Sequence, residues 1–413
     1  MIELLGKSKE ELRAFCAALG EPAYRGGQIY HALYAERKFD FARMTNLPAT
    51  LREGLAKEAS ITLPEVRQRF DSSDGSVRYL LGLSEAEEKR VNPELTEKDN
   101  TEGTEKNRGK PNWPRTPASV EAVFMPSEGR RTVCISTQAG CAVDCHFCLT
   151  AQLGLIRNLT AGEILGQVLV ALEEQRSKSG EAEDQAGLPS KTVGTQKPRK
   201  PAATQPPDPM QTNVVLMGQG EPLLNLDPVM AALRILLDPE GVGISPKHVT
   251  LSTSGIVPGI ERLAQEKVRP KLAISLNASN DEERDALMPI NKKYPLRMLM
   301  EACKNYPLRP WEHLTFEYVM LGDLNDSPED ARRVVRLLAP LKRVKVNLIP
   351  WNPGELPYRE SASERIEEFR RILDDKGVPA FVRYSRGRDV MAACGQLALL
   401  DVSAQSGLVS IGP

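Results

Sequence analysis

The sequence predicts an α/β protein built on a partial (β/α)6 barrel, preceded by a small N-terminal helical domain and a β-hairpin. Two observations predict this fold: strand-like runs alternate with helical segments through residues 132–350, and polar residues follow most of these runs. Such alternation is typical of parallel strands joined by right-handed crossovers, and six units are two short of a closed barrel. Ligand sites in these folds lie at the C-terminal ends of the strands. The six runs are TVCIS, NVVLMG, HVTLS, KLAISL, HLTFEYVM and KVNLIP.

Residues 1–83 are expected to form the N-terminal helical domain and the hairpin. Apolar residues recur at helical spacing in three segments, 4–19, 25–36 and 47–59. Two strand-like runs, VRQRF and VRYLLGL, flank the turn SSDGS, whose Asp-Gly pair is typical of a hairpin. The helical segments between the barrel strands are AGEILGQVLVALEE, LDPVMAALRILL, IERLAQ, DEERDALM with RMLMEACKNY, and SPEDARRVVRLLAP.

Two tracts, residues 84–119 and 175–212, interrupt this pattern. Both are charged and polar, and both are poor in aliphatic residues. Such segments cannot bury enough apolar surface to offset the entropy that ordering would cost. We therefore expect both to be disordered insertions in surface loops. The barrel domain then covers residues 120–395, including a C-terminal cysteine segment, and residues 396–413 form a tail.

Composition and charge exclude several classes of protein. The chain has 413 residues, of which 41% are hydrophobic, and its 54 basic residues balance 55 acidic ones. This balance argues against a polycation that coats nucleic acid. The N-terminus lacks a signal-peptide pattern, and no apolar run approaches the roughly 18 residues needed to span a bilayer. The sequence therefore predicts a soluble, cytoplasmic protein without a membrane segment.

The chain has seven cysteines, too few and too clustered for a disulfide framework. In a reducing compartment, clustered cysteines more often bind metal or take part in chemistry. Cys16 and Cys303 lie in helical patterns and are expected to be buried core residues. Four of the seven fall in CISTQAGCAVDCHFCL, residues 134–149, at the end of the first barrel strand and in the loop after it.

Cys141, Cys145 and Cys148 form a CxxxCxxC loop. Structural zinc needs four ligands, usually as two pairs, and the chain has no second CxxC. His146 lies between two of the cysteines, a poor position from which to complete a tetrahedron. Three thiolates suit an iron–sulfur cluster whose remaining iron stays open for a small molecule.

The cysteine loop and the segment GQGEP, residues 218–222, resemble the radical S-adenosylmethionine (radical SAM) superfamily. Nearly all the chain outside the two insertions is further similar to the RlmN family of adenine carbon-2 methyltransferases. The resemblance implies a 4Fe-4S cluster held by the three loop cysteines, and two molecules of S-adenosylmethionine per turnover. It also implies methylation of adenosine 2503 in 23S rRNA and adenosine 37 in tRNAs, with the N-terminal domain binding RNA. The matching stretches are RGGQIYHALY, EAVFMP, CISTQAGCAVDCHFCLTAQLGLIRNLTAGEI, VVLMGQGEPLLNL, VTLSTSGIVPGI, KLAISLNA, VNLIPWNP and AACGQLA.

The resemblance also implies roles for residues outside the cysteine loop. Cys394 would carry the methyl group as S-methylcysteine, and Cys134 would form a transient disulfide with it. Glu121 would accept the adenine proton. From the residues alone, either cysteine could be a small buried residue, and a strand glutamate is usually just exposed to solvent. The implied cofactor contacts are Gly220, Glu221, Ser252, Ser275, Leu276, Asn277 and Asn352.

Asn277 departs from the family pattern, because the family commonly has SLHA where this chain has SLNA. Asparagine keeps a hydrogen-bond donor and an acceptor but does not titrate. If the family's histidine contacts the cofactor only by a hydrogen bond, little changes. If the charge of that histidine matters, its role does not carry over to Asn277.

Two other functions are compatible with the sequence. A Cfr-type enzyme would methylate carbon 8 of the same adenosine with the same cysteine pair, although the full N-terminal helical domain and the GQGEPLLN segment favour carbon 2. The second is a non-enzymatic zinc- or cluster-binding RNA module. Such a module would have no use for the thiol of Cys394, which lies some 250 residues after the cysteine loop. The resemblance further implies an electron donor such as flavodoxin, and we expect the protein to be a monomer.

Overall fold

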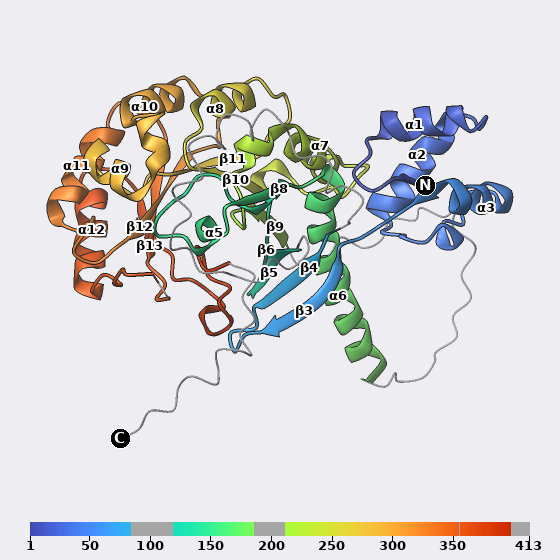
Figure 1. Ribbon diagram of the computed structural model, residues 1–413, viewed down its shortest axis with the longest axis horizontal. Coiled ribbons are helices and arrows are strands. Elements are labelled where there is room, and N and C mark those ends of the chain that lie inside the picture. Colours follow the sequence, from blue (N-terminus) through green and yellow to red (C-terminus); the bar gives the residue numbers. More distant parts are fainter. Residues whose placement is uncertain (84–118, 186–210, 355, 398–413) are drawn as a thin grey trace, which may run out of the picture.

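The computed structural model describes residues 1–83, 119–185, 211–354 and 356–397, with the backbone alone for 177–185. Figure 1 shows a single large sheet at the centre of this part of the chain, with the N-terminal helices at one end. The ten strands described in this sheet follow the order β14 (Ala380–Val382), β13 (Val344–Pro350), β12 (Leu314–Met320), β11 (Lys271–Ser275), β10 (Val249–Thr253), β9 (Gln211–Leu216), β6 (Arg130–Cys134), β5 (Ser119–Ser127), β4 (Val77–Gly82) and β3 (Glu65–Asp71).

The predicted barrel strands are confirmed, because β6, β9, β10, β11, β12 and β13 are parallel neighbours in chain order. The predicted hairpin is also present as the antiparallel pair β3 and β4. β5 joins this hairpin to β6 in antiparallel fashion, and β14 adds one more parallel strand at the opposite edge. The sequence analysis did not predict β5 or β14 as sheet strands. β14 has three residues, too short for a periodic pattern.

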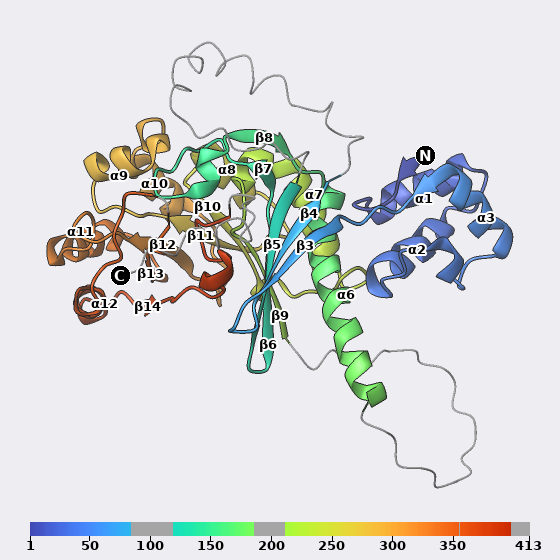
Figure 2. The ribbon, with the colours of Figure 1, turned by 60° about the horizontal axis from the view of Figure 1, so that its bottom comes forward.

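Helices cover the outer side of the parallel strands, as Figures 1 and 2 show, and each predicted helical segment forms one. α12, which was not predicted, buries Ile366, Phe369 and Leu373 at helical spacing. No helix in the described ranges is long and apolar enough to cross a membrane. The helices of the barrel are α5 (Leu149–Gln152), α6 (Ala161–Gln185), α7 (Leu226–Leu237), α8 (Val257–Ala264), α9 (Asp281–Leu287), α10 (Leu296–Asn305), α11 (Pro328–Leu338) and α12 (Ser363–Asp375).

The N-terminal helical domain packs against the barrel through α6 and the end of α7. Tyr30 Oη donates a hydrogen bond of 2.8 Å to Asp238 Oδ2. Gly6 lies against α6 so closely that a Cβ atom on it would come within 2.3 Å of the Gly162 nitrogen. The three predicted helices are present, with a π-helical turn (His31–Ala35) after the second. They are α1 (Lys9–Ala18), α2 (Tyr24–Tyr30) and α3 (Ala49–Glu58), with the short parallel pair β1 (Ile2–Glu3) and β2 (Ala59–Ser60) beside them.

The boundaries of the two predicted insertions need correction. Residues 175–185 continue α6, and residues 211–212 already belong to β9. The sequence QRSKSGEAEDQ is polar, but its Gln, Arg, Lys, Glu and Ala residues favour helix and can extend one already nucleated. Ser119 likewise begins β5 rather than ending the first insertion. The predicted disorder of residues 84–118 and 186–210 lies outside the described residues.

Candidate active site

A cavity of about 170 Å³ opens at the C-terminal ends of the parallel strands, where the sequence predicts the ligand site. The structure brings most of the predicted site residues to its wall from six different segments of the chain, at the ends of strands and in the loops that follow them. Cys134, Glu121 and Leu276 are not part of this wall. The predicted residues that line the cavity are Cys141, Cys145, Cys148, Gly220, Glu221, Ser252, Ser275, Asn277, Asn352 and Cys394.

The cysteine loop is held in place by backbone hydrogen bonds on two sides. On one side, the short antiparallel strands β7 (Gln138–Gly140) and β8 (Leu155–Asn158) flank the loop, and Cys141 N donates to Gly154 O at 3.0 Å. On the other side, His146 N donates to Leu287 O at the end of α9, also at 3.0 Å. Gly140 has a φ of +74°, and a Cβ atom there would lie 1.9 Å from Gly154 O. The loop conformation therefore requires glycine at this position.

The three loop thiols suit a cluster larger than a single metal ion. Burial raises the pKa of Cys141 to about 12 and also raises the pKa values of Cys145 and Cys148. Because the thiolate is the metal ligand, binding must displace these protons. No three His, Cys, Asp or Glu side chains of the described residues close around one ion. The thiols share the wall of one cavity, and three thiolates are the ligand set of a 4Fe-4S cluster with one open iron.

Glu221 shapes the loop after β9 rather than offering a free carboxylate. Its Oε2 accepts hydrogen bonds from Ser254 N at 2.6 Å and Ser254 Oγ at 2.7 Å, and its Oε1 accepts one from Leu223 N at 3.0 Å. Burial raises the pKa of Glu221, while these hydrogen bonds lower it. Gly220 has a φ of +97° and packs against the backbone of Gln138. A bound ligand would therefore meet the backbone of this loop.

Arg284, on α9, ties the ends of β10 and β11 together. It is fully buried, and its Nη2 donates to Ser254 O at 2.6 Å and to Ser275 O at 3.1 Å. Its Nε donates to Leu276 O at 3.1 Å, and its Nη1 to Asn291 Oδ1 at 2.9 Å. Leu276 is itself fully buried, and its backbone is already hydrogen bonded, because its N–H donates to Glu317 O. Burial lowers the pKa of Arg284 to about 10.

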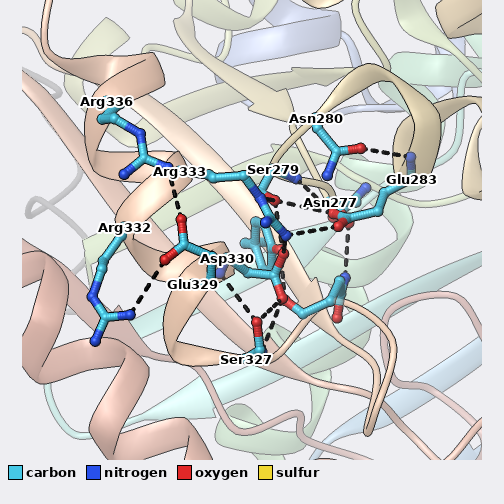
Figure 3. A network of polar contacts seen from close by, with 12 residues as sticks. Asn277, Ser279, Asn280, Glu283, Ser327, Glu329, Asp330, Arg332, Arg333 and Arg336 are labelled. Atoms are coloured by element: carbon cyan, nitrogen blue, oxygen red, sulfur yellow. Dashed lines mark hydrogen bonds and ion pairs between the residues drawn. The ribbon is translucent and has the colours of Figure 1, made fainter.

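Asn277 uses its side chain to join β11 to β12. Its backbone has a left-handed φ of +57°, a conformation that asparagine tolerates better than most residues. Its Oδ1 accepts a hydrogen bond from Val319 N at 2.9 Å, and its Nδ2 lies 3.3 Å from Met288 Sδ. Asn277 therefore forms a polar link between the ends of two strands. Figure 3 shows the neighbouring network, in which Asp330 and Arg333 of α11 hold Ser279 and Glu283.

The C-terminal segment reaches the cavity because several loops bind its backbone. Asn352 Nδ2 donates to Cys394 O at 3.2 Å, and Leu149 N donates to Gly395 O at 2.8 Å. Thr150 Oγ1 donates to Leu397 O at 2.6 Å. These bonds link the segment both to the cysteine loop and to the loop after β13. The segment from residue 396, predicted as a tail, is therefore still ordered against the barrel through residue 397.

Cys394 and Cys134 lie near each other, although they are far apart in sequence. Cys134, at the end of β6, packs in a small apolar cluster with Val123, Ala392 and Leu397. The charge of Cys394 contributes to raising the pKa of Cys134, after the larger effect of burial. Cys394 is exposed to the cavity, yet the protein around its thiol raises its pKa to about 11. All seven cysteines lie in the described residues and are free thiols, with Cys16 and Cys303 buried as predicted.

Glu121 is buried in the sheet instead of being solvated. Its side chain is 1% exposed and forms an ion pair with Arg78, which is itself fully buried. Gln219 Nε2 donates to Glu121 Oε2 at 3.4 Å. In the register of β5 and β6, Val123 lies opposite Cys134, so Glu121, two residues along β5, points to the same face of the sheet as Cys134.

Three polar residues of this site escaped the sequence analysis. Arg284 and Arg78 are fully buried guanidinium groups, and Glu317 is a carboxyl group in the cavity wall. The signal for Glu317 was available, since a lone acid within the apolar strand LTFEYVM is unusual. The two arginines gave no such signal, because arginine is common on exposed surfaces.

The chain matches two family models. Residues 205–338, which include strands β9 to β12 and begin after the cysteine loop, match the model of the radical SAM superfamily. Together with the CxxxCxxC loop at residues 141–148, this match places the protein in the radical SAM superfamily. Residues 2–61, which form the N-terminal helices, match the model of the ribosomal RNA large subunit methyltransferase N-terminal domain.

Relatives that match nearly the full length of the chain show to which family of the radical SAM superfamily it belongs. The chain is 45% identical to the probable dual-specificity RNA methyltransferase RlmN of Koribacter versatilis, over 92% of this chain and 96% of the relative. It is 42% identical to the dual-specificity RNA methyltransferase RlmN of Paracoccus denitrificans, over 95% and 89%. A crystal structure of a radical SAM methyltransferase from Sphaerobacter thermophilus matches with a TM-score of 0.76 and 36% identity, over 96% of this chain and 99% of that one. The protein belongs to the RlmN family of dual-specificity RNA methyltransferases.

Proposed function

We propose that this protein methylates carbon 2 of adenosine 2503 in 23S rRNA and of adenosine 37 in tRNAs, with Cys394 as the methyl carrier. The observation that carries this proposal is the position of Cys394. It shares one cavity with Cys141, Cys145 and Cys148, although the chain between them is long. Family membership supports rRNA and tRNA as the substrates, and the N-terminal helical domain supports RNA binding.

The target atom explains why the site combines a cluster loop with a further thiol. Carbon 2 of adenine has no lone pair with which to attack a sulfonium methyl group, so direct displacement cannot methylate it. When bound, the cluster and S-adenosylmethionine would supply an electron and a 5′-deoxyadenosyl radical. Cys394 would first receive a methyl group and then present it for hydrogen removal and transfer to the adenine. One turnover therefore uses two molecules of S-adenosylmethionine.

Release of the product requires a second thiol and a base. Cys134 would attack the Cys394 sulfur, so that a sulfur–sulfur bond forms as the bond from that sulfur to the adenine-bound carbon breaks. A proton would complete the methyl group, and the unpaired electron would pass to the transient disulfide. The shared apolar cluster supports this pairing, because it brings the strand of Cys134 against residues next to Cys394. Glu121 would accept the proton lost from carbon 2. Its place on the same sheet face as Cys134 supports that role, with Arg78 and Gln219 fixing its carboxylate.

The partners and the cellular location are part of the same proposal. Reduction of the cluster needs an external electron donor, for which a flavodoxin is a suitable class. We propose that the enzyme acts as a monomer in the cytoplasm, where both RNA substrates are found. An adenine within folded RNA must be flipped out to reach the cavity.

The test is nucleoside analysis of RNA methylated by the purified, reconstituted enzyme. We expect mass spectrometry of digested rRNA and tRNA to show 2-methyladenosine, and Cys394→Ala to abolish it while leaving iron content unchanged. Full activity of that variant would refute the methyl-carrier role. The appearance of 8-methyladenosine instead would assign the protein the Cfr-type regiochemistry.

A further inference from the structure

Glu317 is a carboxyl group of the cavity wall that has no part in the mechanism above. It lies within β12, and its side chain points into the barrel because side chains alternate along a strand. The next residue, Tyr318, points the opposite way and contacts the ring of Phe369 on α12, with 5.1 Å between ring centroids. Glu317 is 7% exposed and lines the same cavity as Cys394.

One oxygen of Glu317 is fixed and the other is available. Oε1 accepts a hydrogen bond of 2.9 Å from Asn347 Nδ2, on the neighbouring strand β13. Asn347 Oδ1 in turn accepts a hydrogen bond of 3.1 Å from Arg383 Nε, which sets the orientation of the amide. Within the described residues Oε2 has no hydrogen-bond partner. The carboxylate is therefore oriented but retains a free acceptor.

The surroundings suit a base that works near neutral pH. Burial raises the pKa of Glu317 to about 7, against the lowering effects of the Asn347 hydrogen bond and the charges of Arg383 and Lys345. On its other side, the β11 neighbour is the uncharged Ser275. Cys394 lines the same cavity, and the charge of Glu317 contributes, after burial, to raising the pKa of its thiol.

An ordinary cysteine thiol has a pKa of about 8.5 and is mostly protonated at neutral pH, and a protonated thiol is a poor nucleophile. Methylation of Cys394 therefore needs a group that removes the proton as the sulfur reacts. Both oxygens of Glu221 already accept hydrogen bonds from Ser254 and Leu223. Glu121 is not part of the cavity wall and is paired with Arg78. Among the described residues, Glu317 is the cavity carboxylate with a free oxygen.

We infer that Glu317 is the general base that takes the proton of Cys394 while this sulfur is methylated, an inference that rests on the proposed function. The S–H bond breaks, the proton passes to Glu317 Oε2, and the electron pair of that bond forms the new bond to the methyl carbon. The methyl–sulfonium bond of S-adenosylmethionine breaks at the same time and leaves neutral S-adenosylhomocysteine. No oxidant or reductant is needed.

The experiment follows methylation of Cys394 itself. Holoenzyme with unmethylated Cys394 is reconstituted from apoprotein and mixed with methyl-deuterated S-adenosylmethionine, and the labelled Cys394 peptide is quantified over time by mass spectrometry. Glu317→Gln keeps the size and the hydrogen-bond acceptor toward Asn347 but cannot take a proton. We expect it to methylate Cys394 about 100-fold more slowly. Glu317→Asp, which restores a carboxylate, should recover part of the rate.

The pH profile separates a base from a merely structural residue. A base acts when ionised, so the wild-type rate should rise with pH through about 7, the pKa of Glu317, and then level off. Glu317→Gln should lack this rise. Equal rates and equal profiles in the two proteins would overturn the inference. If the Glu317→Gln variant does not bind iron, its rate cannot be compared with that of the wild type. In that case, a wild-type methylation rate that does not rise with pH near 7 would overturn the inference.

Failure of the inference and failure of the proposed function give different results. A wild-type enzyme that places no labelled methyl group on Cys394 would refute the proposed function. Labelled Cys394 in the wild type, with an unaffected Glu317→Gln variant, would refute only the role of Glu317.

Discussion

Replacement of Arg284 by methionine should destabilise the protein and disorder the mouth of the cavity. The guanidinium group makes four hydrogen bonds, three of them to carbonyl groups at the ends of β10 and β11. Hydrogen bonds of a charged donor contribute about 1.5–3 kcal/mol each, so a simple total is about 6–12 kcal/mol. Methionine fills a similar volume but leaves these buried oxygens without a donor.

The free-energy cost of burying the charged guanidinium group offsets part of the stabilisation that these hydrogen bonds provide. Burial lowers the pKa of Arg284 from 12.5 to about 10. At about 1.4 kcal/mol for each tenfold change in acidity, this desolvation corresponds to roughly 3 kcal/mol. Losses at neighbouring hydrogen bonds are not additive. The net effect is the hydrogen-bond total of about 6–12 kcal/mol minus the desolvation cost of roughly 3 kcal/mol, and non-additivity favours the lower end of this difference. We therefore expect the free energy of unfolding to fall by about 4 kcal/mol.

The assay is urea unfolding followed by circular dichroism, with Arg336→Met as the matched control. Arg336 also pairs with a carboxylate, Glu329, but both side chains are exposed. The control should change the free energy of unfolding by less than about 0.5 kcal/mol. A loss of less than about 1 kcal/mol in Arg284→Met would refute the account of Arg284 as the tie between the two strands.

Two further predictions concern release of the product and the cysteine loop. The variants Cys134→Ala and Glu121→Gln should each trap a covalent adduct of protein and RNA, which is visible as a slower band on denaturing gels. If either variant forms methylated RNA without this adduct, the replaced residue has no role in release of the product. Gly140→Ala should reduce bound iron by at least half while the far-ultraviolet circular dichroism stays the same, because a Cβ atom would lie 1.9 Å from Gly154 O at a φ of +74°. Normal iron content in that variant would show that the loop can shift without losing its cluster geometry.

Local sequence patterns determined much of this protein. The six barrel strands, the hairpin and most of the helices follow from hydrophobic periodicity and turn residues, because these signals depend on neighbours along the chain. The three loop cysteines and the GQGEP segment can also be recognised in short stretches of sequence, because one loop supplies the whole cluster motif. The short strand β14 and the polar end of α6 were missed because neither carries a clear apolar period.

The tertiary structure alone decided which distant residues meet. It placed Cys394 in the cavity by hydrogen bonds to a segment that has no periodic pattern of its own, and it brought Cys134 close to it. It also showed that Glu121 is buried against Arg78, and that Glu317 presents a free oxygen to the cavity. Burial and charge pairing depend on what lies across the sheet, which a linear pattern does not encode. The reactive groups could be identified from the sequence, whereas the fold determined their surroundings and therefore their chemistry.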